Sequence, residues 1–448
     1  MPVHVFKSTG KELFRVFYYS QVHGTEDETR MACFLLIDDI KLNPGGYYDN
    51  VSIAIMPTVN VDGFAHDPPT YATPFGWDCD IDAMARFTPE ARNVFNFVKT
   101  WKPQVTVDGH NLNRYFASTN YALQRNLARS DDFVVFKLET QTPRKDITHK
   151  QYIDMFKELR TLYPQYLFSE FWTINDVAPS YDGSRSRAQY YTDDPALIYQ
   201  FMAQRYNTIG FLSEGISPFD LTDPDEYAIR EEIARRSNYL FLKYLVDYFK
   251  KRTHLVSPKV CILEQGTEIP VNWTPRLELA QFQTFNVEDR DSGAPRHYVS
   301  DEYQIYYDPI RWVTIPLGYS YPNTEAFGEL TYYLNTQYDY DLFVGSASNI
   351  YDIETIHIIS SDPGTRFENV HKAWQDGPKN VSAVNVDSRM TDFSNMVIVP
   401  CNQEGGHFLC QLLEPYSKYA LTRYYEEINL ELIDDSDYPI KRLITRIA

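Results

Sequence analysis

The sequence is poor in cysteine and in long apolar stretches, and each shortage narrows the class of protein. Only 5 cysteines occur among 448 residues, and they are widely scattered. Neither a disulfide framework nor a cysteine-ligated zinc site is therefore indicated. No apolar run approaches the roughly 18 residues that a membrane-spanning helix needs, so we expect no membrane insertion.

Basic residues are also in short supply. Lysine and arginine total 42 against 61 aspartates and glutamates, which gives a formal net charge of −19. Such a charge repels phosphate backbones and anionic lipid surfaces, so nucleic acid is not an expected partner. The composition, 43% apolar and 23% charged, is globular, and the length predicts two or three domains.

Apolar periodicity predicts alternating strands and helices in the first half of the chain. The expected strands are 3–7, 13–19, 51–56, 104–108 and 208–213, and the expected helices are 25–42, 89–101, 149–162 and 224–250. The first two strands are expected to be joined by a turn. This alternation favours an α/β fold with a mixed, largely parallel twisted sheet flanked by helices.

The segment from Lys251 to Pro258 ends the last of these helices, and beyond it come short strand-like runs rich in Tyr, Val, Ile and Thr. We place a domain boundary here, which divides the chain into domains 1–255 and 256–448. The second domain is expected to be mixed α/β and strand-rich, an accessory to the first. Its expected elements are a strand at 341–344 and helices near 324–335, 405–413 and 417–425.

A histidine and a glutamate stand three positions apart where an expected strand gives way to a helix, in Ser20-Gln-Val-His23-Gly-Thr-Glu26. Zinc accepts nitrogen from histidine and oxygen from glutamate, and catalytic zinc sites use three protein ligands. His110 follows the expected strand 104–108, and loops at strand ends are where ligands gather in such sheets. His110 is therefore the candidate third ligand.

The order of four segments resembles the zinc carboxypeptidase (carboxypeptidase A-like, or funnelin) superfamily over residues 3–250. These segments are His23-Gly-Thr-Glu26, Asn60-Val-Asp62-Gly63, His110 and Phe211-Leu-Ser-Glu214. The segments 309–316, 412–415 and 438–443 are similar to the C-terminal region of large bacterial members.

The resemblance implies one Zn²⁺ per chain, bound by His23, Glu26 and His110. It also implies that Glu214 is the general base that takes a proton from zinc-bound water, and that a peptide or peptide-like amide is the substrate. An outer carboxylate normally accepts the second N–H of a zinc-bound histidine. An ungapped match assigns this role to Asp78, and a shift of two residues would assign it to Asp80.

The sequence departs from the family pattern where a substrate carboxylate would bind. The family's Asn-Arg pair is replaced by Asp80 and Ile81, and no arginine stands between Gly63 and Asp78, where the family has one for the oxyanion. Candidate substitutes are Arg114 and Arg205, and further candidates are Arg185 and Arg187. The family's mobile tyrosine has two candidates, Tyr190 and Tyr191, of which Tyr191 is our choice for substrate binding.

Two functions are therefore open, a zinc hydrolase and a catalytically impaired relative that binds peptide or glycan. The N-terminus lacks the basic and apolar regions of a secretory signal, and the strand and helix that open the family fold are missing. If the chain is a truncated form of a longer precursor, we expect it to be exported, to the periplasm or beyond the cell. Otherwise we expect it in the cytoplasm.

Overall fold

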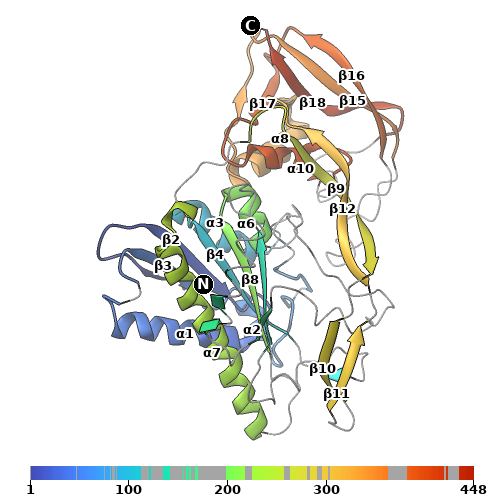
Figure 1. Ribbon diagram of the computed structural model, residues 1–448. Helices are drawn as coiled ribbons and strands as arrows, with labels where there is room; N and C mark the ends of the chain where they lie inside the picture. The colour runs from blue at the N-terminus through green and yellow to red at the C-terminus, as the bar shows by residue number, and fades with distance from the viewer. Residues whose placement is uncertain are drawn as a thin grey trace.

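The computed structural model describes most of the chain, in two sheet-containing parts (Figure 1). The described residues are 2–112 (except 47, 75, 81, 83–85 and 87), 121–122, 135–141, 155, 158–159, 161–162, 167–169, 198–216, 224–256, 263–279, 283–289, 295–300, 303–361, 381–417, 420–421 and 433–447. Within these ranges no helix combines the length and the apolar character that crossing a membrane would require.

A seven-stranded mixed sheet forms the first part, in the order β1-β3-β2-β4-β8-β6-β7. Its centre is parallel, because β2 pairs with both β3 and β4, and β4 pairs with β8, all in parallel. Strands β1 and β6 pair antiparallel with β3 and β8. The strands are β1 His4–Phe6, β2 Phe14–Ser20, β3 Val51–Met56, β4 Val105–Leu112, β6 Val135–Gln141, β7 Leu167–Ser169 and β8 Ile209–Ile216.

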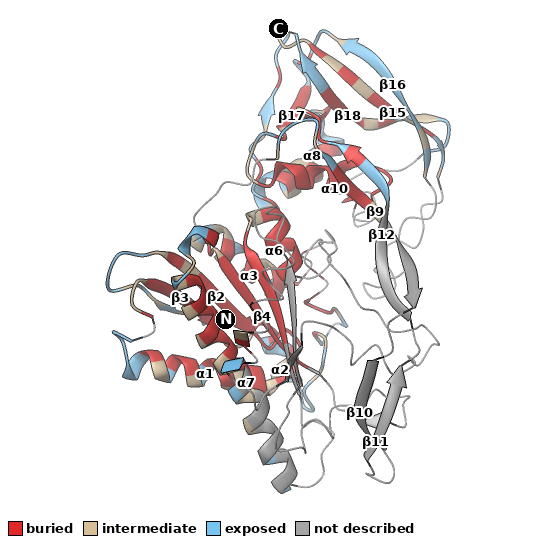
Figure 2. Ribbon diagram, viewed as in Figure 1, coloured by how far each residue is buried: buried red, intermediate tan, exposed pale blue. Residues whose placement is uncertain are grey.

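Helices cover both faces of this sheet, as alternation along β2 requires. Phe14, Val16 and Tyr18 pack with residues of α1 (Asp27–Leu42) and α7 (Pro224–Lys250) in one buried cluster. Phe17 and Tyr19 belong to a second cluster on the opposite face, with α3 (Pro89–Trp101) and α6 (Ile198–Tyr206). The predicted α/β class, with a mixed sheet between helices, is confirmed (Figure 2).

The expected strands 3–7 and 13–19 are present as β1 and β2, and the structure adds two details that the sequence did not predict. Strands β1 and β2 are not paired with each other, because β1 pairs with β3, which lies between them in the sheet. The fourth and fifth expected strands, 104–108 and 208–213, continue past their predicted ends, to Leu112 and Ile216. His110 and Glu214 therefore lie within strands rather than in the loops that follow them. Most of the expected helix 149–162 and most of 417–425 lie outside the described residues.

A six-stranded antiparallel sheet forms most of the second part, in the order β14-β17-β13-β18-β15-β16. The predicted strand-rich character of this region is confirmed. The strands are β13 Gly318–Pro322, β14 Phe343–Val344, β15 Tyr351–Ser360, β16 Ser382–Met390, β17 Met396–Pro400 and β18 Ser436–Arg446. The short helices α2 (Val61–Ala65), α8 (Gly328–Tyr332) and α10 (Leu409–Leu413) complete the elements used below.

Two antiparallel strand pairs lie outside the six-stranded sheet. Strand β9 (Glu268–Leu279) pairs with β12 (Tyr303–Thr314), and β10 (Gln283–Asp289) pairs with β11 (Pro295–Ser300). Strand β10 also pairs antiparallel with β5 (Tyr121–Ala122), which belongs to the first 255 residues. Backbone hydrogen bonds thus join the two predicted domains, and the position of the boundary between them stays a prediction.

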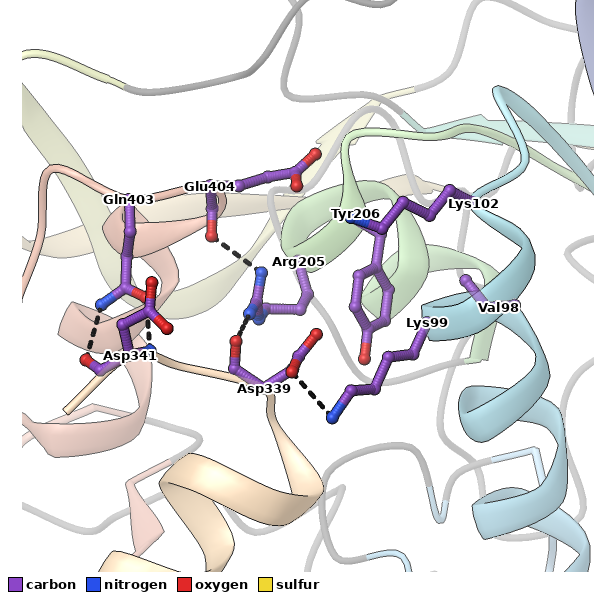
Figure 3. A pocket seen from close by; sticks show the side chains of 9 residues that line it. All are labelled: Val98, Lys99, Lys102, Arg205, Tyr206, Asp339, Asp341, Gln403 and Glu404. Carbon is purple, nitrogen blue, oxygen red and sulfur yellow. Dashed lines mark hydrogen bonds and ion pairs between the residues drawn. The ribbon is translucent and has the colours of Figure 1, made fainter.

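Helix α6 contacts the second part through its side chains (Figure 3). The guanidinium of Arg205 donates to the backbone carbonyls of Tyr338, Asp339 and Glu404, at 2.8, 2.7 and 2.7 Å. One buried apolar cluster includes Phe201 of α6 together with Phe408 of the second part. The two sheets therefore share a hydrophobic core, and neither part presents an independent apolar surface at this junction.

Arg205 was expected to reach the substrate cleft, and the structure overturns that expectation. Its guanidinium is engaged by three carbonyls of the second part and lines a polar pocket at the junction. The pocket is also lined by Val98, Lys99, Lys102, Tyr206, Asp339, Asp341, Gln403 and Glu404. Gly405 packs against the Arg205 carbonyl with φ of +65°, a close approach that a Cβ would obstruct.

Replacing Arg205 by alanine should lower the free energy of unfolding by about 3 kcal/mol or more, because three carbonyls lose a charged donor. Urea denaturation followed by circular dichroism measures the change. Arg389→Ala is the control, because its ion pair with Asp352 is exposed and should contribute at most about 1 kcal/mol. Equal losses in the two variants would contradict the role of Arg205.

His407 gives the junction a pH dependence. Burial, with the nearby charge of Arg205, lowers the pKa of His407 to about 4. In the unfolded chain the same histidine has a pKa of about 6.5. Between about pH 6.5 and 4 the unfolded chain therefore binds a proton that the folded protein does not, and the free energy of unfolding falls as the pH drops through this range. His407→Gln should remove roughly 3 kcal/mol of that loss at the acidic end. Urea midpoints at neutral and acidic pH, compared between variant and wild type, test this; identical pH profiles would contradict it.

Candidate metal centre

His23 lies in the tight loop that follows β2. Its neighbour Gly24 packs so closely against the α2 loop that a Cβ there would lie 2.4 Å from the carbonyl carbon of Gly63. The backbone N–H of Gly24 donates to the Tyr71 carbonyl at 3.2 Å. The ring of Tyr71 stacks on the His23 imidazole with centroids 3.6 Å apart. These contacts hold the imidazole in one orientation, buried at the end of the sheet.

Asn60 and Gly63, which carry the family-like segment after β3, build the loop that supports His23. The Asn60 side chain accepts a hydrogen bond from the Gly63 N–H at 2.8 Å and so caps α2. Its Nδ2 donates to the Tyr71 carbonyl at 3.2 Å. The role of Asn60 is therefore to fix the loop that packs on His23.

Glu26 occupies the N-cap position of α1 but makes no side-chain capping hydrogen bond. Its carboxylate turns instead toward the two histidines. Oε1 lies 2.9 Å from Nδ1 of His23, and Oε2 lies 3.2 Å from Nδ1 of His110. Oε2 also accepts the backbone N–H of Asn111 at 3.1 Å.

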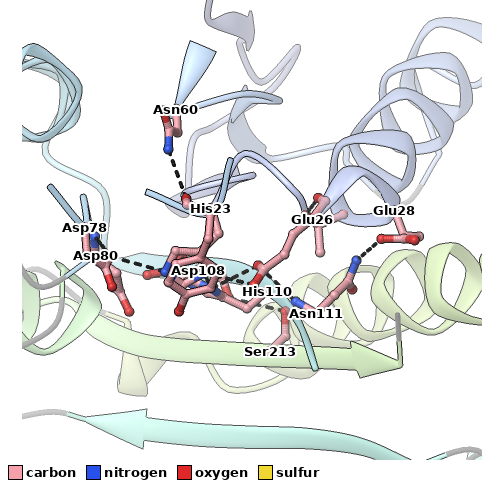
Figure 4. A network of polar contacts seen from close by, with 12 residues as sticks. His23, Glu26, Glu28, Asn60, Asp78, Asp80, Asp108, His110, Asn111 and Ser213 are labelled. Carbon is pink, nitrogen blue, oxygen red and sulfur yellow. Dashed lines mark hydrogen bonds and ion pairs between the residues drawn. The ribbon is translucent and has the colours of Figure 1, made fainter. Parts of the chain in front are cut away.

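The three predicted ligands converge on one buried point (Figure 4). Nδ1 of His110 and Nδ1 of His23 face each other at 3.2 Å, with the Glu26 carboxylate beside both. His23, Glu26 and His110 are 4%, 6% and 1% exposed, so bulk solvent has little access to them. Ligands of a tetrahedral zinc ion, at about 2.0–2.1 Å from the metal, lie about 3.3 Å from one another. The separations observed are close to that value.

Each imidazole has a carboxylate on its other nitrogen. Nε2 of His23 lies 3.2 Å from Oδ1 of Asp78, the residue predicted for this outer role. Nε2 of His110 lies 2.9 Å from Oδ1 of Asp108 in an ion-pair contact, and the Tyr19 hydroxyl donates to the other oxygen of Asp108 at 2.9 Å. A carboxylate beside Nε2 favours the ring proton on that nitrogen, which would leave Nδ1 available to a metal ion that displaces the other proton.

Buried negative charge exceeds positive charge in this cluster. Burial opposes a charge on His23, but Glu26 and Asp78 outweigh it and raise its pKa to about 10. Burial, helped by Asp108 and Asp78, raises the pKa of Asp80 to about 8. Acids that share a dry space hold their protons or require a cation. A divalent cation would neutralise them, so the donor set fits the zinc ion that the sequence predicts.

Glu214 is placed by strand register. In the parallel pair β4–β8, Glu214 is the Cα partner of His110. Neighbouring strands in a sheet lie about 4.8 Å apart, so the fold brings the backbone of the proposed base next to a proposed ligand. That its carboxylate acts as the base stays a prediction. Arg114 and Tyr191, the other candidates for substrate binding, lie outside the described residues, as do Arg185, Arg187 and Tyr190.

Sequence analysis missed Asp108 and Asn111, both of which help to hold the cluster. Asp108 and His110 are two residues apart on one strand and therefore share a face, so strand periodicity could have found Asp108. Asn111 donates through its backbone to Glu26 and through its side chain to the buried Glu28. No spacing rule links Asn111 to α1, because the two meet only through sheet packing.

Comparisons with known proteins find similar structures but no matching family model or curated sequence. No protein-family model matches the sequence, and no curated protein matches it significantly. Similar solved structures include metallo-carboxypeptidases from Pseudomonas aeruginosa and Burkholderia cenocepacia, with 14% and 13% identity and TM-scores of 0.39 and 0.36; each match covers 56% of this chain and 61% of the other. Bovine thrombin-activatable fibrinolysis inhibitor is similar at 12% identity and a TM-score of 0.35, with 56% of this chain and 86% of that chain covered.

These neighbours are carboxypeptidase-type metallopeptidases, the superfamily that the sequence resembles. The chain spans about three fifths of the length of the two bacterial enzymes. Because every TM-score reported is below 0.5, no residue role or activity is carried over from them. The metal centre is instead inferred from its own distances, burial and charge.

Asp108→Asn should weaken zinc binding by about 10- to 100-fold, because it removes the anionic partner of His110 while keeping the size of the side chain. Competition with a chromophoric chelator measures the dissociation constant. Asp62→Asn is the control, since Asp62 is exposed on α2 and should leave zinc affinity unchanged. Wild-type affinity in Asp108→Asn would show that the outer carboxylate has no role.

Proposed function

We propose that the chain is a zinc-dependent hydrolase that cleaves a peptide or peptide-like amide bond. The observation that carries this proposal is the convergence of His23 Nδ1, Glu26 and His110 Nδ1 within 3.2 Å in a buried space. Two imidazoles and one carboxylate form a common ligand set of catalytic zinc sites. The carboxylates at both Nε2 atoms are the outer partners that such histidines require.

Each residue has a distinct task in this proposal. His23, Glu26 and His110 would hold the ion, and Asp78 and Asp108 would keep both imidazoles oriented with Nδ1 toward it. When bound, zinc supplies a Lewis acid that polarises the scissile carbonyl and acidifies the attacking water. Glu214 accepts the proton of that water and passes it to the leaving amine. The register of β8 beside β4 supports this assignment.

Ordinary removal of a C-terminal residue is not the activity that we propose. The residue at the anchor position, Asp80, has no cationic group with which to bind a free carboxylate. The guanidinium carbon of Arg86 lies 4.2–4.7 Å from the ring centroids of Phe95, Phe201 and Tyr338. This cation therefore packs between aromatic side chains, including those of α3 and α6. Cell-wall peptides, modified side chains and acylated amino acids fit a site without that anchor better than free C-termini do.

A second candidate function is a catalytically impaired protein that binds peptide or glycan. One observation favours it. Arg205, a candidate replacement for the missing oxyanion arginine, donates its hydrogen bonds to three backbone carbonyls of the second part instead. Losing an oxyanion donor typically costs about 100- to 1000-fold in turnover. Retention of the ligands together with Glu214 favours the hydrolase, because a binding protein needs no base.

Glu214→Gln separates the two candidates. For a hydrolase, the substitution should reduce turnover of blocked peptides and acylated amino acids by about 100- to 10,000-fold, because the base is lost, while zinc content stays stoichiometric. Glu329→Gln, an exposed position on α8, is the control and should keep full turnover. Stoichiometric zinc without turnover of any substrate by the wild type, and peptide binding unaffected by Glu214→Gln, would favour the binding protein.

A further inference from the structure

Tyr71 is an exposed aromatic residue at the metal centre that the proposed mechanism does not use. Its ring stacks on the His23 imidazole, with centroids 3.6 Å apart and planes inclined by 16°. Tyr71 is 43% exposed, whereas His23, Glu26 and His110 are at most 6% exposed. Because His23 covers one face of the ring, the exposure of Tyr71 comes from its outer face and its edges.

Tyr71 is the point at which the buried cluster meets solvent. Among the described residues, the side chains that bond to or stack on His23 are those of Glu26, Asp78, His110 and Tyr71. Of these four, Tyr71 alone is exposed. A molecule that reaches the proposed ligands from solvent therefore has the outer face of the Tyr71 ring within reach.

The backbone holds this ring in place. The Tyr71 carbonyl accepts hydrogen bonds from the N–H of Gly24 and from Nδ2 of Asn60, both at 3.2 Å. The preceding N–H, of Thr70, donates to the Gly63 carbonyl at 2.9 Å. A ring fixed in this way binds a ligand without a further loss of conformational entropy, which favours its use as a binding surface.

The charge around Tyr71 favours a cation on the outer face. Residues 42–85 contain no lysine and no arginine, and Asp62 and Asp67, in the same loop as Tyr71, are exposed. The face of an aromatic ring carries partial negative charge and attracts ammonium and guanidinium groups. Phe64, also in this loop, already has such a partner, because the guanidinium carbon of Arg30 lies 4.5 Å from its ring centroid.

We propose that the outer face of Tyr71 is a subsite for a cationic group of the substrate, an amine or a guanidinium close to the scissile amide. The inference rests on the proposed function for the reaction, but the binding that it describes can be measured without turnover. It narrows the substrate class to amides that carry a basic side chain or a free amino group. A neutral ring could stack on the same face but would gain nothing from Asp62 and Asp67.

Two ligands of matched size test the subsite. Binding of Nα-acetyl-lysine amide and Nα-acetyl-norleucine amide to the zinc-loaded protein is measured by ligand-observed NMR titration. The lysine amide should bind about 2- to 30-fold more tightly, which is the range that a cation on an aromatic face gives. Tyr71→Leu should remove most of this preference, and Tyr71→Phe should keep it, because phenylalanine retains the ring face.

The matched control is Tyr332→Leu, which replaces a tyrosine that is 48% exposed on α8 and should leave the preference unchanged. Zinc affinity, measured by chelator competition, shows whether His23 is still held in Tyr71→Leu. If that variant loses zinc, the double substitution Asp62→Asn with Asp67→Asn decides, because both acids are exposed and should lower the preference at low salt.

Three results would overturn the inference: equal binding of the two amides by the wild type, an unchanged preference in a zinc-replete Tyr71→Leu or in the double variant, or a preference lost in Tyr71→Phe. Turnover separates this inference from the proposed function. If the wild type hydrolyses lysine and norleucine peptides with equal kcat/KM, the hydrolase stands and the subsite fails. If it cleaves neither but binds the lysine amide in a Tyr71-dependent way, the subsite stands and the hydrolase fails.

Discussion

The site depends on one electrostatic constraint: two imidazole nitrogens face each other at 3.2 Å in a dry space surrounded by carboxylates. Neither the facing lone pairs nor the acids are stable there without a proton or a cation between them. The surrounding structure must therefore hold the groups in place against their mutual repulsion. The parallel strands β2, β4 and β8 do so, because their backbone hydrogen bonds set the spacing of the residues at their ends.

Helix α6 connects this constraint to the rest of the molecule. Its first residue donates to the carbonyl of Asp80 beside the metal centre, and Arg205, near its other end, is bound by three carbonyls of the second part. Strand β8, which carries Glu214, follows directly. The second part is thus packed against the helix that precedes the strand carrying Glu214, and among the described residues it supplies no donor to the cluster of His23, Glu26 and His110.

The charge of the centre distinguishes this chain from the family that it resembles. The metal-directed residues are present and are backed by two outer acids, whereas the positions expected to receive a substrate carboxylate hold Asp80 and no arginine. Such a set of donors suits a cation better than a carboxylate. The same substitution therefore weakens the case for a C-terminal exopeptidase.

The sequence by itself determined the features that depend on neighbours along the chain. The bounds of β3, α3 and α7 follow from apolar periodicity, and the approach of His23 to Glu26 follows from the short loop between a strand and a helix. His110 as the third ligand was expected from its place beyond the strand 104–108 and from the family resemblance, and the sheet pairing of β2 with β4 brings it there.

Only the tertiary structure decided which distant groups meet. It paired β1 with β3, brought Asp108 behind His110, turned Arg205 toward the second part and pointed Asp80 at the histidines. The physical reason is that spacing along a chain sets which side chains share a face of an element. Which faces come together depends instead on the packing of segments far apart in sequence, and local patterns do not encode it.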